Sequence, residues 1–229
     1  MVAITARSAL LEASRIVVKV GSALLVDEDN NTINTDWLYG IARDISRLKV
    51  AGKNVVVVSS GAIALGSRLL KIHNKNMSLQ EKQAAAATGQ VTLAHAWMDA
   101  LNTHNVQTAQ ILLSPDDTET RRKHLNARAT MGALLDLGAV PVVNENDTVA
   151  TAEIRFGDND RLAARVAAMI GAELLILLSD VDGLYTTNPN LNKTANHLAL
   201  IEHINDEITA MAGNANAQYA SGGMVTKLE

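Results

Sequence analysis

The sequence predicts an α/β fold in which an open, mostly parallel sheet is sandwiched between helices (α/β/α). Short β-branched runs alternate with longer helical patterns along the 229-residue chain, the order expected of parallel strands joined by crossover helices. The predicted strands are apolar almost throughout, as strands buried on both faces are. No internal repeat interrupts the pattern, and three prolines are too few for a proline-rich linker. We therefore expect one continuous domain over residues 1–229, and leave open a subsidiary lobe at its C-terminal end.

The first strand and the first long helix are predicted from residues 15–52. The run RIVVKV over residues 15–20 predicts a buried strand. From Asp36 to Ala51, apolar residues recur at three- and four-residue spacing, which indicates an amphipathic helix. Asn34 or Thr35 is the expected N-cap, and Gly52 stands where a helix ends.

A second strand over residues 55–58 and a helix over 62–70 follow in the same way. Ser78 and Glu81 form the sequence pattern of a capping box, which opens an Ala-rich helix reaching to about Thr103. The remaining predicted elements are strands over 110–113, 140–143 and 174–178, and helices over 116–137 and 159–170.

Composition excludes several classes of protein. Apolar residues make up 48% of the chain, too many for a disordered protein. No apolar run approaches the roughly 20 residues that span a bilayer, and the first residues lack the apolar block of a signal peptide. The absence of cysteine excludes disulfides, thiolate metal sites and a thiol nucleophile. With 20 basic and 24 acidic residues and no basic run, we expect no nucleic-acid partner. The lack of a spanning segment, a signal peptide and cysteine leads us to expect no membrane association and a cytoplasmic location.

Small and polar residues follow four of the predicted strands. In open parallel sheets, ligands bind beyond the carboxyl ends of the strands. The four clusters are Gly21-Ser22, Ser59–Gly61, Asn144–Asp147 and Ser179-Asp180. Any one of them is as readily explained as a turn, since these residue types favour turns. Four at one rim favour a ligand site.

Lys19 lies inside the otherwise apolar first strand, two residues before Gly21. A lysine buried there without a partner is costly to desolvate, so it either reaches the rim or meets an anion. Gly21 and Ser22 can turn backbone N–H groups toward such an anion. Both the usual dinucleotide fingerprint and the usual phosphate-binding loop are missing from the sequence.

The segment from Asn144 to Asp158, NENDTVATAEIRFGD, is a long connection between a strand and a helix. Connections of this length are usually functional or disordered, and residues 154–156 suggest a small hairpin. Its carboxylates could bind a substrate ammonium, organise lysines or hold a metal, although the spacing fits no Ca²⁺ loop. The alternative is that Asp158 or Asn159 serves only as a helix N-cap.

A second glycine-rich segment, SGGMVTK, closes the sequence over residues 221–227 and could wrap a phosphate tail. The six histidines have no convincing serine or aspartate partners, so we expect neither a hydrolytic triad nor a zinc site. The Ser59–Gly61 turn lacks the G-x-S-x-G pattern of a nucleophile elbow.

Together these segments resemble the glutamate 5-kinases of the amino acid kinase family, from about Arg15 to the end of the chain. The segments that carry the resemblance are VVKVGSALL (17–25), VVVSSGAIALG (56–66), LNAR (125–128), VPVVNENDTVATAEIRFGDND (140–160), LLSDVDGLYTTNP (177–189) and SGGMVTK (221–227). The NEND…GDND segment is the most specific of them.

The resemblance implies ATP-dependent phosphorylation of the γ-carboxylate of L-glutamate, the first step of proline biosynthesis, on an amino acid kinase-like fold. ATP would enter with Mg²⁺ held mainly by its phosphates, and no metal ligand is expected from the protein. Proline is the implied feedback inhibitor, and a homo-oligomer is the implied assembly.

The resemblance also assigns roles to residues of this sequence. Lys19 and Lys227 would flank the transferring phosphoryl group, and Asp160 would hold the two lysines. The residues assigned to glutamate are Ser60, Asn144, Asp147, Asp158 and Asn159. Those assigned to ATP are Lys19, Gly21, Ser22, Ser179, Asp180, Ser221, Gly222, Gly223, Met224, Val225, Thr226 and Lys227.

The chemistry agrees with these roles, because an ionised carboxylate acceptor needs no general base and phosphoryl transfer depends on positioning and charge stabilisation. Two unit charges about 4 Å apart interact by about 4 kcal/mol at an effective dielectric constant near 20. Two ammonium groups and Mg²⁺ can offset a repulsion of that size.

This sequence departs from the resemblance in two ways. Residues 179 and 221 are Ser where the family often has Thr, a change that keeps the hydroxyl. The sequence stops at Glu229, whereas relatives continue for a closing helix and strand and many add a PUA domain. We expect no PUA domain in these residues and leave open a truncated kinase domain.

Two other functions stay open at this stage. One is a sibling kinase that acts on aspartate, acetylglutamate, carbamate or UMP. The other is a fragment that binds a nucleotide or an amino acid without catalysis.

Overall fold

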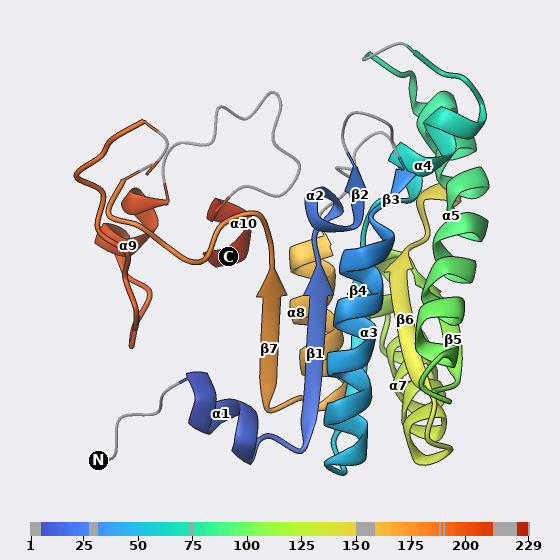
Figure 1. The fold of residues 1–229 in the computed structure, drawn as a ribbon, viewed down its shortest axis with the longest axis horizontal. Helices are drawn as coiled ribbons and strands as arrows, with labels where there is room; N and C mark the ends of the chain where they lie inside the picture. The colour runs from blue at the N-terminus through green and yellow to red at the C-terminus, as the bar shows by residue number, and fades with distance from the viewer. Residues whose placement is uncertain are drawn as a thin grey trace.

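Five parallel strands form the central sheet of the computed structural model, which describes residues 6–27, 32–73, 76–149, 159–187, 189, 191–212 and 224–228 (Figure 1). Every neighbouring pair in the sheet is parallel. In spatial order the strands are β5 (Thr108–Leu113), β6 (Val140–Glu145), β4 (Asn54–Ser59), β1 (Arg15–Val20) and β7 (Leu174–Leu178). The predicted α/β class and all five predicted strands are confirmed.

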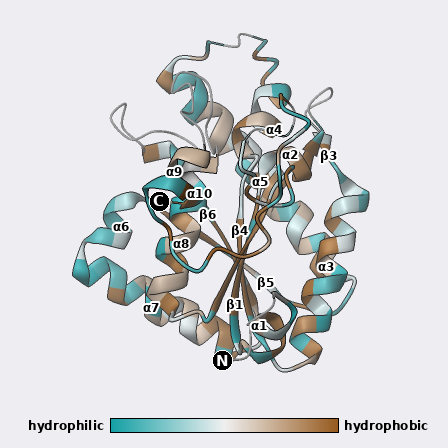
Figure 2. Ribbon diagram, turned by 90° about the vertical axis from the view of Figure 1, so that its left-hand side faces the viewer, coloured by the Kyte–Doolittle hydropathy of each residue, from teal (hydrophilic) through white to brown (hydrophobic). Residues whose placement is uncertain are grey.

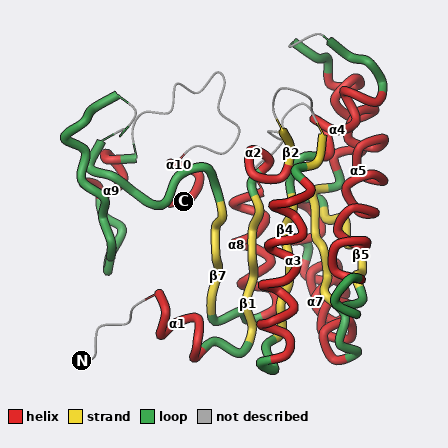
Figure 3. Tube along the Cα trace, in the orientation of Figure 1, coloured by secondary structure: helices red, strands yellow, loops and turns green. Residues whose placement is uncertain are grey.

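Helices connect and cover these strands (Figure 3). The longer ones are α3 (Thr35–Val50), α4 (Ala62–Leu69), α5 (Leu79–Asn102), α7 (Arg121–Asp136) and α8 (Asn159–Ile170). The shorter ones are α1 (Ala6–Glu12), α2 (Ser22–Leu25), α6 (Pro115–Glu119), α9 (Asp206–Met211), α10 (Met224–Leu228) and the 3₁₀ turn η1 (Asp147–Val149). Strands β2 (Val26–Asp27) and β3 (Thr32–Ile33) pair in an antiparallel ribbon. None of the helices in the described ranges is both long and apolar enough to cross a membrane.

The sheet has a hydrophobic core on each face. Side chains alternate along β1, so Ile16 and Val18 pack with the buried side chains of α3 and α5, while Val17 packs with those of α7 and α8. Viewed near its edge in Figure 2, the hydrophobic sheet has α7 and α8 on one side and α3 on the other. Because Lys19 shares a face with Val17, its side chain starts on the α8 side of the sheet.

The predicted helix signals are largely confirmed. The Asn34 side chain accepts a hydrogen bond from the backbone N–H of Trp37, and so caps α3. Ser78 and Glu81 form the predicted capping box at the start of α5. Gly52 lies past the end of α3 with a φ of 78°, a left-handed conformation that glycine adopts without strain.

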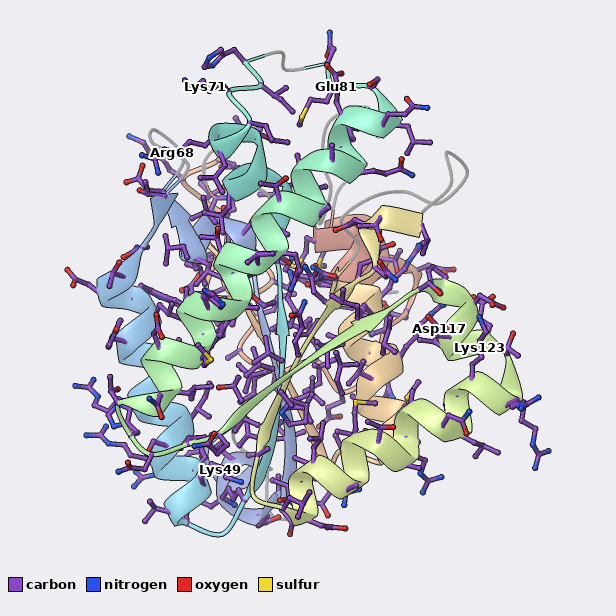
Figure 4. The ribbon with its side chains drawn as sticks, turned by 90° about the vertical axis from the view of Figure 1, so that its right-hand side faces the viewer. Lys49, Arg68, Lys71, Glu81, Asp117 and Lys123 are labelled. Atoms are coloured by element: carbon purple, nitrogen blue, oxygen red, sulfur yellow. The ribbon has the colours of Figure 1, made fainter. Side chains whose placement is uncertain are left out.

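The prediction of one continuous helix over residues 116–137 is wrong. The structure has α6 and α7 there, separated at Thr120, whose ψ of 114° is extended. The Thr120 hydroxyl donates to the Asp116 carboxylate. The ammonium group of Lys123 on α7 lies 3.2 Å from the carboxylate of Asp117 on α6. Figure 4 shows Lys123 and Asp117 next to each other at this corner. These polar contacts stabilise a bend that helical periodicity alone does not indicate.

Local sequence patterns also missed the short elements α1, α2, β2, β3, α9 and α10, which have too few residues for a periodic signal. The predicted hairpin at residues 154–156 lies outside the described residues.

Helices α4 and α5 touch at two glycines. A Cβ atom on Gly89 would lie 1.9 Å from the carbonyl oxygen of Ala62, and one on Gly66 would lie 1.7 Å from the carbonyl oxygen of Ala85. Any side chain at these positions would overlap backbone atoms that have no rotamer with which to move away. Glycine therefore sets the distance between α5 and the carboxyl end of β4, where α4 begins.

We predict that Gly89→Ala lowers the free energy of unfolding by about 2 kcal/mol or more, because the two helices must separate. Gly132→Ala on α7 is the matched control, since its Cβ would meet no atom within 4 Å. The control should be stabilised by about 0.5–1 kcal/mol, the helix-propensity difference. Denaturant unfolding measures both. Equal stability of Gly89→Ala and the parent protein would contradict the close contact.

Candidate active site

A crevice is expected at the carboxyl ends of β4 and β6, because the connections that follow these two strands run to opposite faces of the sheet. The chain leaves β4 toward α4 and α5 on one face of the sheet, and leaves β6 toward α8 on the other face. Neighbouring strands whose connections diverge in this way form the usual ligand site of an open α/β sheet. Two of the predicted rim clusters, Ser59–Gly61 and Asn144–Asp147, lie at these two ends.

Lys19 meets Asp160 at the carboxyl end of β1, the strand next to β4 in the sheet. Lys19 comes from β1 and Asp160 from the first turn of α8, and Lys19 Nζ lies 2.6 Å from Asp160 Oδ1. The two side chains are 8% and 1% exposed, so the interaction is an ion pair largely removed from water. A carboxylate in the first turn of α8 is also favoured by the positive end of the helix dipole.

Lys227 completes the charged cluster from the C-terminal end of the chain. Its Nζ, carried by α10, lies 2.9 Å from the other carboxylate oxygen of Asp160, Oδ2. Each oxygen of Asp160 therefore faces one ammonium group, and the three side chains together carry one positive charge. The predicted meeting of the two lysines on Asp160 is what the geometry shows.

Two opposing effects determine the pKa of Asp160. Burial raises this pKa, but the hydrogen bonds and positive charges of Lys19 and Lys227 lower it by more. The pKa of Asp160 therefore lies below its usual range. Asp160 is therefore a fixed negative charge at neutral pH, suited to holding two ammonium groups and unsuited to proton transfer.

Asn159, next to Asp160 on α8, joins β4 to β6. Its Nδ2 donates to the Ser60 hydroxyl at 2.8 Å, to the Ser59 carbonyl at 3.1 Å and to Asn144 Oδ1 at 3.0 Å. Three of the residues predicted to bind an acceptor, Ser60, Asn144 and Asn159, thus form one polar group, in which Asn144 and Asn159 are buried. This placement follows from strand order, because β4 and β6 are neighbours although β5 separates them in the sequence.

Gln90 on α5 belongs to the same group, and sequence analysis missed it. Asn144 Nδ2 donates to Gln90 Oε1 at 2.7 Å. Gln90 is the polar residue that ends the stretch AAAATGQ, residues 84–90, in the middle of an Ala-rich helix. A polar residue at this position looks like any other helix residue in the sequence. Its role becomes visible only when β6, which carries Asn144, is known to lie beside it.

A cavity of about 250 Å³ lies next to this polar group. It is lined by residues of α5, the β5 and β6 strands and η1, among them Ala86, Gln90, Glu145 and Asp147. Two acidic residues, Glu145 and Asp147, therefore line the same cavity, and both are buried. Burial and the negative charge of Glu145 raise the pKa of Asp147 to about 7.

Four further residues that were assigned to ATP follow β1 and β7. The Gly21 N–H donates to the carbonyl oxygen of Leu178 at 3.0 Å, and a Cβ on Gly21 would lie 3.2 Å from that oxygen and 3.9 Å from Lys19 Nζ. Ser22 begins α2, and Ser179 and Asp180 follow β7 at the same rim.

The final glycine-rich segment is only partly described. Met224 and Lys227 lie in α10, as do Val225 and Thr226 by their backbone. Residues Asp158, Ser221, Gly222 and Gly223 lie outside the described residues.

Within the described ranges, no three His, Asp or Glu side chains form a group that could hold a metal ion. The charged groups that converge at the carboxyl end of β1 are ammonium groups held by one carboxylate. Such an arrangement favours a polyanionic ligand over a bare cation.

The raised pKa of Asp147 predicts a pH-dependent stability. Between about pH 4, the pKa of an unfolded aspartate, and pH 7, the folded protein keeps a proton that the unfolded chain has lost, so this group's contribution to stability falls as pH rises. Asp147→Asn removes the titration, so its gain in Tm over the parent should grow from pH 5 to pH 8 by about 2 °C or more.

Thermal unfolding at several pH values measures this gain, and Asp136→Asn, at an exposed carboxylate on the end of α7, is the control. A gain in Tm that is the same at pH 5 and pH 8 would show that Asp147 does not titrate in this range.

The amino acid kinase family model matches residues 14–229. Curated relatives named "Glutamate 5-kinase" include those of Gluconobacter oxydans, 55% identical over 96% of this chain and 58% of the relative, and of Brucella anthropi, 58% identical over 94% and 57%. The chain spans about three fifths of the length of these relatives. The crystal structure of a UMP kinase from Bacillus anthracis has the same fold, with a TM-score of 0.55 and 18% identity over 81% of this chain and 72% of that one. The chain belongs to the amino acid kinase family.

Proposed function

We propose that these residues form an amino acid kinase domain that transfers the γ-phosphoryl group of ATP to the γ-carboxylate of L-glutamate, giving γ-glutamyl phosphate. The observation that carries the proposal is the pair of ammonium groups, Lys19 and Lys227, held on Asp160, whose neighbour Asn159 contacts Ser60 and Asn144. The relatives named glutamate 5-kinase support glutamate as the acceptor.

In the proposed reaction, a γ-carboxylate oxygen of glutamate attacks the γ-phosphorus of ATP. The new O–P bond forms as the bond to the β,γ-bridging oxygen breaks, and ADP leaves with that electron pair. The acceptor carboxylate is already ionised at neutral pH, so no side chain must remove a proton.

The protein must then bring the negatively charged γ-carboxylate of glutamate close to the negatively charged phosphates of ATP. Lys19 and Lys227 stabilise the charge on the transferring group, and Asp160 keeps them in place without cancelling both charges. Mg²⁺ bound mainly by the ATP phosphates supplies further positive charge when ATP is present.

The acceptor would lie at the carboxyl ends of β4 and β6. Ser60 and Asn144 offer a hydroxyl and an amide N–H that suit the α-carboxylate, whereas Asn159 Oδ1 and an ionised Asp147 suit the ammonium group. Asp158 is proposed for the same ammonium group on the resemblance alone. ATP would lie at the carboxyl ends of β1 and β7, near Gly21, Ser22, Ser179 and Asp180, and against the 221–227 segment.

The wider biological setting is proposed on the same basis. It comprises the first step of proline biosynthesis, a cytoplasmic location, inhibition by proline and a homo-oligomeric assembly. The names of the relatives support the first of these.

Glutamate kinase activity is tested with ATP, Mg²⁺ and L-glutamate, by trapping the acyl phosphate with hydroxylamine and measuring ADP in parallel. We expect hydroxamate and ADP in equal amounts, with much lower ADP release when aspartate, acetylglutamate, carbamate or UMP replaces glutamate. Turnover with one of those acceptors and none with glutamate would assign the domain to a sibling kinase. Calorimetric binding of ATP or glutamate without turnover would indicate a binding module.

Lys19→Ala should lower kcat by about 10²-fold or more, the scale of losing one preorganised charge-stabilising donor. Lys49→Ala on α3 is the matched control, since Figure 4 shows Lys49 at the end of the molecule opposite the site. Steady-state kinetics with saturating ATP and glutamate measure both variants. A kcat within a factor of two of the parent would remove Lys19 from the mechanism.

A further inference from the structure

Three side-chain amides, contributed by α5, β6 and α8, form a continuous hydrogen-bonded chain. It runs from Gln90 through Asn144 to Asn159, with distances of 2.7 Å and 3.0 Å, and ends on the Ser60 hydroxyl at 2.8 Å. We propose that Gln90 is a positioning residue, which acts through Asn144 to hold Asn159 in the orientation that binds the acceptor. The acceptor's identity as an amino acid rests on the proposed function, whereas the positioning itself does not.

The orientation of two of these amides, Asn144 and Asn159, is fixed by a backbone group of known polarity. The N–H of Glu145 can only donate, and it donates to Asn144 Oδ1 at 2.9 Å. The Asn144 amide must therefore turn its Nδ2 toward Gln90, whose Oε1 accepts. In the same way, the carbonyl of Ser59 can only accept, so Asn159 turns its Nδ2 toward β4.

This orientation leaves the other end of the Asn159 amide for a ligand. Asn159 is 4% exposed, and its Oδ1 has no hydrogen-bond partner within the described part of the chain. A buried carbonyl oxygen without a donor is costly, and native proteins rarely keep one without a use. A ligand carrying an N–H donor, such as the ammonium group of an amino acid, would satisfy it.

Gln90 controls this arrangement because Asn144 is itself buried. Asn144 is 3% exposed, so without Gln90 Oε1 the donor at Nδ2 would lose its protein partner in a place that water reaches poorly. The Asn144 side chain would then move to find another acceptor and withdraw Oδ1 from Asn159. The neighbouring residue Gly89 strengthens the argument, because its contact with the Ala62 carbonyl prevents α5 from shifting to compensate.

The kinetic test compares two identical substitutions on one helix. Gln90→Met keeps the length of the side chain and removes the acceptor, while Gln83→Met, two turns earlier on α5, is the control. We expect Gln90→Met to raise the KM for glutamate about tenfold with the KM for ATP and kcat changed less than twofold, and Gln83→Met to change none of them. Equal increases in both KM values would indicate a general packing role and overturn the proposal.

A double-substitution experiment tests the route through Asn144. If Gln90 acts through Asn144, Gln90→Met should have little further effect on the KM for glutamate once Asn144→Ala is present. Effects that multiply in the double variant would show that Gln90 acts independently, against the proposal.

A third measurement needs no activity. The side-chain NH₂ resonances of Asn159, identified through their loss in Asn159→Asp, should shift in Gln90→Met and stay in place in Gln83→Met. Unchanged resonances in Gln90→Met would exclude positioning by Gln90 whatever the substrate. Shifted resonances in a protein that does not phosphorylate glutamate would instead keep the positioning role and reject the proposed function.

Discussion

The ion pairs of Asp160 with Lys19 and Lys227 connect the beginning, the middle and the end of this chain. All three side chains are largely shielded from water, so the attraction between them is strong and the cost of leaving any one without a partner is high. Taking charges out of water costs several kcal/mol per ion, which makes such a cluster a poor source of stability compared with an apolar core. Its presence at the carboxyl end of β1 is better explained by what it does, which is to hold two cations close together with one anion.

The cluster depends on the register of the sheet and on the start of α8. Lys19 is aligned with Val58 of β4 and Leu177 of β7 and shares a face with Val17. Helix α8 packs on that face through Val166, Met169 and other apolar residues, and its first turn therefore lies at the carboxyl end of β1. Moving Lys19 by one residue along β1 would turn its side chain to the α3 side, away from Asp160.

The polar group beside the cluster uses the same helix end for a different purpose. Asp160 turns toward the lysines, while the adjacent Asn159 turns toward β4 and β6. One turn of α8 thus faces the proposed phosphoryl-transfer site and the proposed acceptor site together. The Gly66 and Gly89 contact brings α5 close enough for Gln90 to join the second site.

Local sequence patterns determined the strands, most of the long helices and their caps, because each depends on residues within a few positions of one another. Lys19 stood out as a charge in an apolar strand, and the resemblance assigned Asp160 and Lys227 to it. Tertiary structure alone decided the strand order, the bend at Thr120, the role of Gln90 and the raised pKa of Asp147. These features arise from contacts between residues far apart in sequence, where burial and the neighbouring charge or amide, and not the local pattern, set the energy.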